Sequence, residues 1–195
     1  MNTQTNTKSL DNLANGIRER LKKLAGNENN QDVRSDVMDD ICQLVSTACN
    51  DDDFVNKHLP ARKAGEADRE VLYQDGESGF CICGHVYAKA AHGKAHDHGP
   101  SWAIYGQADG VTEMTDWKII DSPDADVDSG NSAKKDRFNL VEPVRTYTMK
   151  RGDVKLYDVG DVHSPSRSKP VKLIRIEGTN LDHVKRSLIR ERDIQ

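Results

Sequence analysis

The sequence of 195 residues lacks most of the features that mark secreted, membrane-spanning or nucleic-acid-binding proteins. It has four cysteines and no CxxC pair, so a disulfide framework is not expected. No apolar run approaches the ~20 residues of a membrane helix, and the polar first residues lack the apolar segment of a signal peptide. The formal net charge is -4, with basic and acidic residues interspersed, which argues against a nucleic-acid-binding surface. We therefore expect a soluble, cytoplasmic protein that binds neither nucleic acid nor a membrane.

Aromatic residues are also few, at 5%, and hydrophobic residues make up 35% of the chain against 31% charged residues. A chain of this length and composition fits one compact domain with an extensive solvated surface. Its first third predicts helices, because apolar residues recur there at spacings of three and four. These residues are Leu13, Ile17, Leu21 and Leu24, followed by Val33, Val37, Ile41, Leu44 and Val45.

From about residue 70 the sequence changes to short runs rich in β-branched and aromatic residues, such as FCICGHVYA and VKLIRI, separated by turn residues. No helical stretch lies between them, which favours an antiparallel sandwich or barrel over a parallel sheet. We predict a mainly β barrel at 66–178, with a helical segment at 1–65 packing on it. The polar segment 122–136 is expected to be a surface loop. A C-terminal helix is predicted within 179–195, with its apolar side formed by Leu181, Val184, Leu188 and Ile189.

Two histidines separated by one residue, His96 and His98, project from the same face if their segment is one extended strand. Neutral imidazole binds iron, zinc, copper or nickel, but two ligands hold a metal loosely, so a third ligand is expected. His163 is the candidate, at the end of the glycine-bounded segment RGDVKLYDVGDVH. We predict that these three histidines bind one divalent transition metal.

The two histidine-containing segments together resemble the two signature motifs of the cupin superfamily. Gly152, Gly160 and His163 have the spacing of the second motif, with Asp158 in place of its usual proline. The resemblance implies a cupin-type double-stranded β-helix, which is a jelly-roll barrel, with the metal inside it. Many cupins also place a glutamate four or five residues after the second histidine as a fourth metal ligand.

This chain has Trp102 and Ala103 at the positions of that glutamate. A three-histidine site with open coordination positions results, as in the thiol dioxygenases. The run GQADGVTEMTDW is similar to the stretch after the histidine pair of cysteine dioxygenase, and the likeness covers roughly 65–178. It implies iron(II) as the metal and dioxygen as a co-substrate. The serine, histidine, tyrosine relay of cysteine dioxygenases is absent, because Arg175 and Glu177 stand at two of the matching positions. The motifs look most like a bacterial branch of metal-dependent double-stranded β-helix proteins.

Five further residues are candidates for substrate binding or catalysis. Tyr105 would donate a proton or hydrogen bond to a metal-bound group, or would simply fill the barrel interior. Arg175 would bind a substrate carboxylate if it faces inward, and would be a surface charge otherwise. Trp102 and Tyr157 are expected to line the pocket. Arg69 is the approximate counterpart of the arginine that binds the substrate carboxylate in cysteine dioxygenases.

The sequence leaves three functions open. The first is an iron(II) dioxygenase that acts on a small anionic or thiol substrate. The second is a redox-neutral lyase, isomerase or hydrolase that uses zinc, nickel or manganese as a Lewis acid. The third is a non-catalytic protein that binds a metal or ligand, because fold alone does not decide function. Barrel edges and the apolar helix faces also permit a homodimer.

Overall fold

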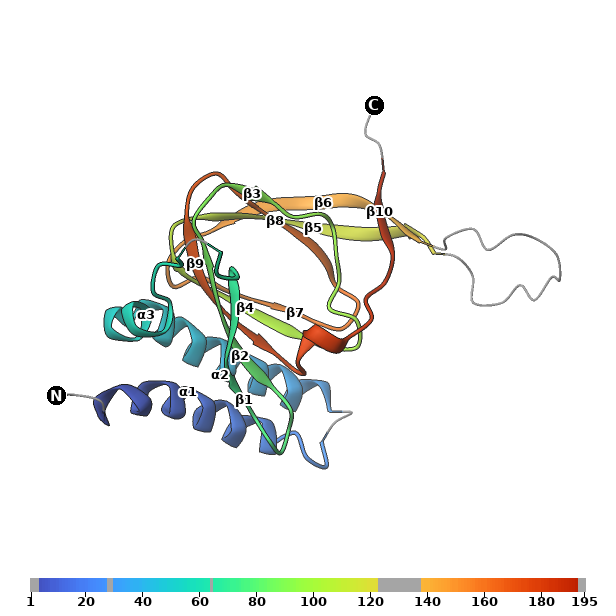
Figure 1. The fold of residues 1–195 in the computed structure, drawn as a ribbon. Helices are drawn as coiled ribbons and strands as arrows, with labels where there is room; N and C mark the ends of the chain where they lie inside the picture. The colour runs from blue at the N-terminus through green and yellow to red at the C-terminus, as the bar shows by residue number, and fades with distance from the viewer. Residues whose placement is uncertain (1–3, 28–29, 64, 123–137, 193–195) are drawn as a thin grey trace.

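The computed structural model describes residues 4–27, 30–63, 65–122 and 138–192 (Figure 1). Nearly all of the expected surface loop at 122–136 lies outside the described residues. In these described residues three helices come first, and ten strands and one short 3-10 helix follow. The helices are α1 (Gln4–Lys22), α2 (Gln31–Asn50) and α3 (Asp52–His58), and the 3-10 helix is η1 (Leu181–His183). The strands are β1 (Arg69–Gln74), β2 (Cys81–Tyr87), β3 (Ala91–His92), β4 (Ala103–Asp109), β5 (Thr112–Asp121), β6 (Asn139–Met149), β7 (Val154–Tyr157), β8 (Val162–Arg167), β9 (Val171–Glu177) and β10 (Ile189–Glu191).

Polar side chains satisfy the free backbone groups at the start of α2 and α3. The Asn30 side chain accepts hydrogen bonds from the backbone N–H groups of Asp32 and Val33, both at 3.2 Å. Asp51 accepts from the backbone of Asp53 at 2.9 Å and begins α3 in the same way. None of the described helices combines the length and apolar character needed to cross a membrane. The helical amino-terminal segment predicted from apolar spacing is confirmed.

The described strands form two five-stranded sheets, with the orders β1-β2-β9-β4-β7 and β10-β6-β5-β8-β3. Neighbouring strands in these sheets are antiparallel, except that β10 runs parallel to β6. Without the outer strands β1 and β10, each sheet keeps four strands in the order of a jelly roll. The fold is therefore a jelly roll, or double-stranded β-helix, preceded by three helices.

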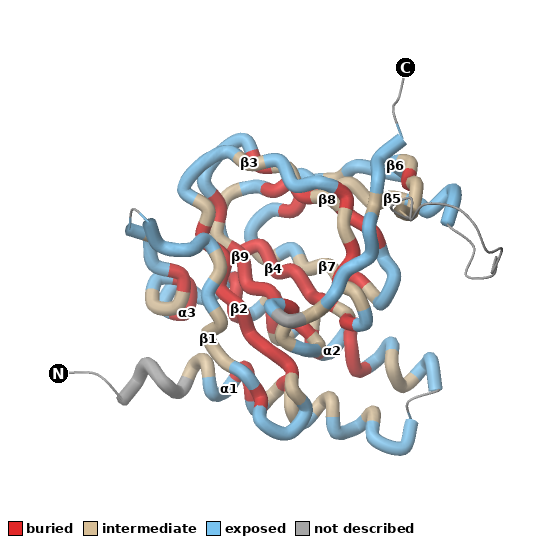
Figure 2. Tube along the Cα trace, turned by 45° about the vertical axis from the view of Figure 1, so that its right-hand side comes forward, coloured by how far each residue is buried: buried red, intermediate tan, exposed pale blue. Residues whose placement is uncertain are grey.

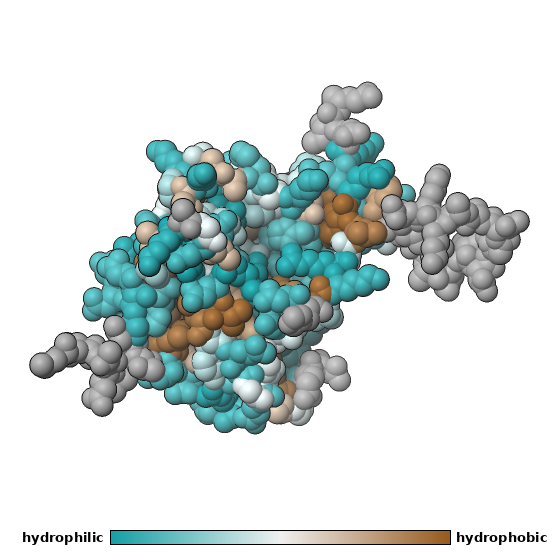
Figure 3. Space-filling view, viewed as in Figure 1, coloured by the Kyte–Doolittle hydropathy of each residue, from teal (hydrophilic) through white to brown (hydrophobic). Residues whose placement is uncertain are grey.

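The sheet that contains β2, β9 and β4 separates two cores. Ile82, Ile104 and Ile174 pack against the helices, whereas Tyr105 and Leu173, at alternate positions of β4 and β9, pack inside the barrel. Figure 1 shows the helices on the outer face of this sheet and the second sheet beyond its inner face. Figure 2 shows buried residues along β2, β9 and β4. The surface in Figure 3 is mostly hydrophilic, with one hydrophobic patch where the helices meet the sheet and a second one near β10 and the ends of β5 and β6.

The prediction of a C-terminal helix is wrong. The segment forms the short η1 and then β10, which pairs in parallel with the start of β6. Leu181 is buried but Leu188 is 59% exposed, so the apolar residues of this segment do not share one docking face. The edge of β6 offers backbone hydrogen-bond partners that a helix in this place would leave unpaired. Apolar spacing alone does not reveal that edge.

Candidate metal centre

Three histidines from two separate parts of the chain meet inside the barrel. Their candidate ligand nitrogens lie within 4.8 Å of one another. The ring centroids are 4.6 Å apart for His96 and His163 and 4.9 Å apart for His98 and His163. His163 is the second residue of β8, whereas His96 and His98 lie in the connection between β3 and β4. The predicted extended strand for this pair is reduced to one isolated bridge, in which His96 and His163 exchange backbone hydrogen bonds of 3.0 Å.

The ring nitrogens of these histidines are largely without protein partners. His163 has no exposed surface, and neither of its ring nitrogens has a hydrogen-bond partner among the described residues. Nδ1 of His98 is also buried and unpartnered. Nδ1 of His96 lies 2.8 Å from the carbonyl oxygen of Lys94, which fixes the ring and leaves Nε2 for a ligand. Buried polar atoms are normally paired, so converging unpaired imidazole nitrogens fit a metal ion.

Burial also keeps the three imidazoles in the form that binds metals. Burial lowers the pKa of each ring, most strongly for His163 and His98, because the charged imidazolium loses its hydration. The positive charge of Arg175 lowers the pKa of His98 further. Neutral imidazole is the ligand form, so little proton release opposes metal binding at neutral pH.

The loop that carries His96 and His98 is held by the C-terminal segment. The Asp97 carboxylate accepts hydrogen bonds from the backbone N–H of Gly99 at 3.1 Å and of Ser187 at 3.3 Å. The Glu191 carboxylate accepts from the backbone N–H of Ala95 at 2.8 Å. Gly99 adopts a φ of +60°, and a Cβ atom there would lie 2.8 Å from the carbonyl oxygen of Lys185. This position therefore requires glycine.

Tyr105 and Arg175 form a polar chain that ends at the histidines. The Tyr105 hydroxyl lies 3.1 Å from Nε2 of His98 and accepts a hydrogen bond of 3.1 Å from Nη1 of Arg175. Nε of Arg175 donates to the Glu177 carboxylate at 2.7 Å. Both Arg175 and Tyr105 are buried in the barrel, so Arg175 faces inward. The Tyr105 hydroxyl is thus held beside one candidate metal ligand.

Glu177 is a fully buried carboxylate that two arginines share. Besides Arg175, it accepts a hydrogen bond of 2.9 Å from Nη2 of Arg69 and one of 3.2 Å from the backbone of Leu181. Arg69 also pairs with Asp182 at 2.7 Å. Both predicted carboxylate-binding arginines therefore already have a carboxylate partner within the protein.

The two predicted pocket aromatics lie on opposite sides of the sheet. The Tyr157 ring stacks on His163 with a centroid distance of 3.7 Å, and its hydroxyl lies 2.8 Å from that of Tyr147. Burial raises the pKa of Tyr157, so it stays protonated. Trp102 instead packs with the core on the helix side and against Gly178. Tyr157 is brought to the metal centre and Trp102 is not.

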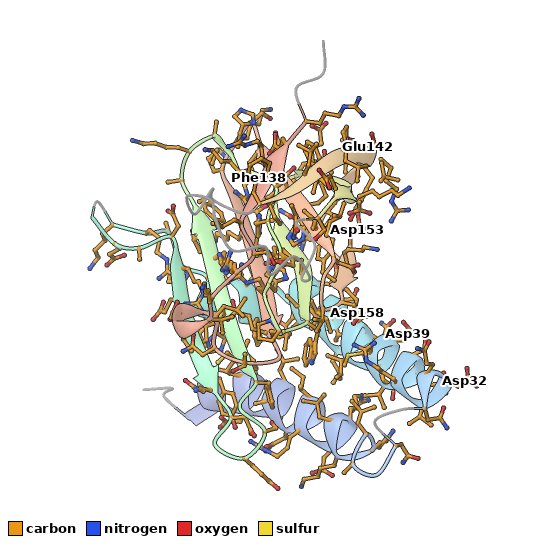
Figure 4. All side chains as sticks on the ribbon, turned by 90° about the vertical axis from the view of Figure 1, so that its right-hand side faces the viewer. Asp32, Asp39, Phe138, Glu142, Asp153 and Asp158 are labelled. Carbon is orange, nitrogen blue, oxygen red and sulfur yellow. The ribbon has the colours of Figure 1, made fainter. Side chains whose placement is uncertain are left out.

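A cavity of about 290 Å³ adjoins the metal centre through Tyr157. Asp116, Trp117 and Lys155 also line it. A larger cavity, of about 510 Å³, lies outside the barrel against α2, where Asp39 and Asp158 are seen in Figure 4. None of the three histidines lines either cavity.

No protein-family profile and no curated protein sequence matches the chain. Similar solved structures include a protein with a double-stranded β-helix domain from Klebsiella pneumoniae, at 14% identity and TM-score 0.44, over 69% of this chain and 88% of that chain. KdgF from Halomonas sp. is 11% identical, with TM-score 0.41, over 63% of this chain and 91% of that one. The DMSP lyase DddQ from Ruegeria pomeroyi is 11% identical, with TM-score 0.41, over 67% and 57%. The fold assignment rests on the strand order described above.

Proposed function

We propose that the protein is a mononuclear metal-dependent enzyme in which His96, His98 and His163 bind iron(II) and which oxidises a small anionic or thiol substrate with dioxygen. The observation that supports this proposal is the convergence of three imidazoles, two of them buried with unpartnered nitrogens, in a cluster that includes no carboxylate of the described residues. Three protein ligands leave coordination positions free, and iron(II) bound there would supply the oxygen chemistry. The resemblance to thiol dioxygenases favours iron over zinc.

The side chains around the cluster would position the substrate and one proton. The Tyr105 hydroxyl, held by Arg175, lies where it can donate to or accept from a group near His98. Tyr157 would form the wall behind His163. Direct binding of the substrate by Arg175 or Arg69 would break their buried ion pairs with Glu177. Arg175 would therefore act by holding Tyr105, and Arg69 by holding Glu177.

A redox-neutral lyase, isomerase or hydrolase is the second candidate. The observation that favours it is the Tyr105 hydroxyl at 3.1 Å from a candidate metal ligand, a geometry that also suits an acid–base group beside a Lewis acid. Such an enzyme would use zinc, nickel or manganese and would turn over without oxygen.

Metal analysis of the purified protein and two histidine variants tests the ligand assignment. We expect wild-type protein to retain a stoichiometric divalent metal and His163→Ala to lose it, with an unchanged circular dichroism spectrum. His92→Ala is the matched control, because His92 is exposed and bonds Ser166 at 2.8 Å outside the cluster. Unchanged metal content in His163→Ala would contradict the assignment.

Oxygen consumption separates the two candidate functions. The metal-loaded protein is screened anaerobically and aerobically against small thiols and carboxylates. Consumption of oxygen with product formation supports the dioxygenase, and product formation without oxygen supports the redox-neutral enzyme.

A further inference from the structure

Arg167, at the end of β8, is a buried arginine with no ion-pair partner among the described residues, and the charge of Asp68 acts on it from beyond ion-pair distance. The residue is only 5% exposed, and its Nε is a buried donor with no hydrogen-bond partner. No carboxylate of the described residues forms an ion pair with it. By contrast, Arg175 pairs with Glu177, and Arg69 pairs with both Glu177 and Asp182. A buried cation without a partner is costly, so its retention suggests a ligand that supplies the negative charge.

Tyr87 and His85 lie beside Arg167 and complete a polar cluster. The Arg167 guanidinium stacks on the Tyr87 ring, with Cζ 3.9 Å from the ring centroid. The Tyr87 hydroxyl lies 3.1 Å from Nδ1 of His85. His85 is 3% exposed, and its Nε2 is a second buried atom without a partner. If the Tyr87 hydroxyl donates to Nδ1, Nε2 carries a hydrogen and becomes a second free donor.

The polar cluster of Arg167, Tyr87 and His85 shares the barrel interior with the three histidines. His163 and Arg167 are four residues apart on the same face of β8, which corresponds to roughly 13 Å between their Cα atoms. On β2, His85 is two residues from Cys83, which pairs across the sheet with Arg175. Arg175 in turn bonds Tyr105 beside His98. The polar interior therefore extends from the histidines to Arg167.

We propose that Arg167, with Tyr87 and His85, forms a subsite that binds the carboxylate of a small organic acid whose other end reaches the metal. A guanidinium presents two parallel N–H groups that match the two oxygens of a carboxylate. Tyr87 covers one face of the guanidinium and orients it, and His85 offers a further donor. That the other end of the acid reaches a metal rests on the proposed function. Binding of the carboxylate by Arg167 does not depend on a metal.

Calorimetric titration of metal-free protein with propionate and with its neutral analogue propionamide tests the subsite. Wild-type protein should bind propionate and show little binding of propionamide. Arg167→Gln should weaken propionate binding about 10- to 100-fold, because a charge-assisted pair is lost. Arg167→Lys, which keeps the charge but not the two parallel donors, should have an intermediate affinity. Arg192→Gln is the matched control, since it removes the same charge from an exposed pair and should bind like wild type.

The structural alternative is that Arg167 only packs on Tyr87. Thermal unfolding without ligand distinguishes the two roles. If Arg167 is a binding residue that stays unpaired without ligand, Arg167→Gln should be at least as stable as wild type. If Arg167 only packs on Tyr87, the variant should be less stable. Equal binding of propionate and propionamide by wild type, or unchanged propionate binding by Arg167→Gln, would overturn the proposal. Metal content of wild-type protein is measured in parallel. Normal metal content without propionate binding rejects the subsite alone, and propionate binding without retained metal rejects the metal centre alone.

Discussion

At the scale of single residues, Glu177 determines which arginine side chains inside the barrel are available to a ligand. It is completely buried and pairs with both Arg69 and Arg175. Removing one partner of such a group leaves an uncompensated buried charge, so the three residues form one unit. Arg175 therefore acts on the site through its hydrogen bond to Tyr105.

His85 is expected to make the protein sensitive to mild acid. Burial lowers its pKa well below 6.5, and the charges of Arg175 and Arg167 lower it further. Below pH ~6.5 the unfolded chain therefore binds a proton that the folded chain does not, so the free energy of unfolding falls as the pH falls. The His85 contribution should be on the order of 1 kcal/mol between pH 7.5 and 5.5.

Urea denaturation of EDTA-treated wild type and His85→Gln at both pH values measures this contribution. The variant should lose less stability than wild type on acidification, by on the order of 1 kcal/mol. Equal losses in the two proteins would show that folding does not lower the pKa of His85.

The sequence predicts part of the site because two of its signals are local. The HxH spacing and the glycine-bounded segment before His163 predicted the convergence that the structure shows. The Arg167 cluster could not be predicted in this way. Arg167 belongs to a turn-like stretch of basic and small residues, and its burial depends on strands β2 and β3, distant in sequence.

At the scale of elements, α2 packs on β4 at Gly106. A Cβ atom at this glycine would lie 2.5 Å from Cγ1 of Val45 and 2.7 Å from Sγ of Cys49. The close approach lets the helix lie on the sheet that carries Tyr105 on its other face. The sequence showed the apolar stripe of α2 but not the point where it meets the sheet.

Gly106→Ala should destabilise the fold by about 1–3 kcal/mol through overpacking against α2. Gly76→Ala is the control, because nothing lies within 4 Å of a Cβ atom there. Urea denaturation midpoints of the two variants are compared. Equal shifts of the denaturation midpoint in the two variants would show that α2 can move away from β4 without a loss of stability.

The C-terminal segment shows where apolar spacing misleads. Leu181, Val184, Leu188 and Ile189 have helical spacing, yet the chain follows the edge of β6 instead. The choice depends on a partner strand about fifty residues earlier, and a local pattern contains no information about it.

At the scale of the whole molecule, the metal should stabilise the fold because it joins β8 to the β3–β4 connection. A ligand that binds only the folded state at 100 times its Kd adds about 2.7 kcal/mol to the free energy of unfolding. Adding iron(II) anaerobically to metal-free protein should therefore raise its melting temperature. His163→Ala should show no such rise, and an equal rise in both proteins would place the metal elsewhere.

The segment 185–191 holds the loop of His96 and His98 through Ser187 and Glu191. During synthesis both loop histidines leave the ribosome well before His163, and His163 leaves before these holding residues. A nascent chain thus lacks the support of this loop until its last strand has emerged. We expect tight metal binding only when residues 187–191 are in place, so a purified chain that ends at residue 186 should retain less of the ion than the full chain.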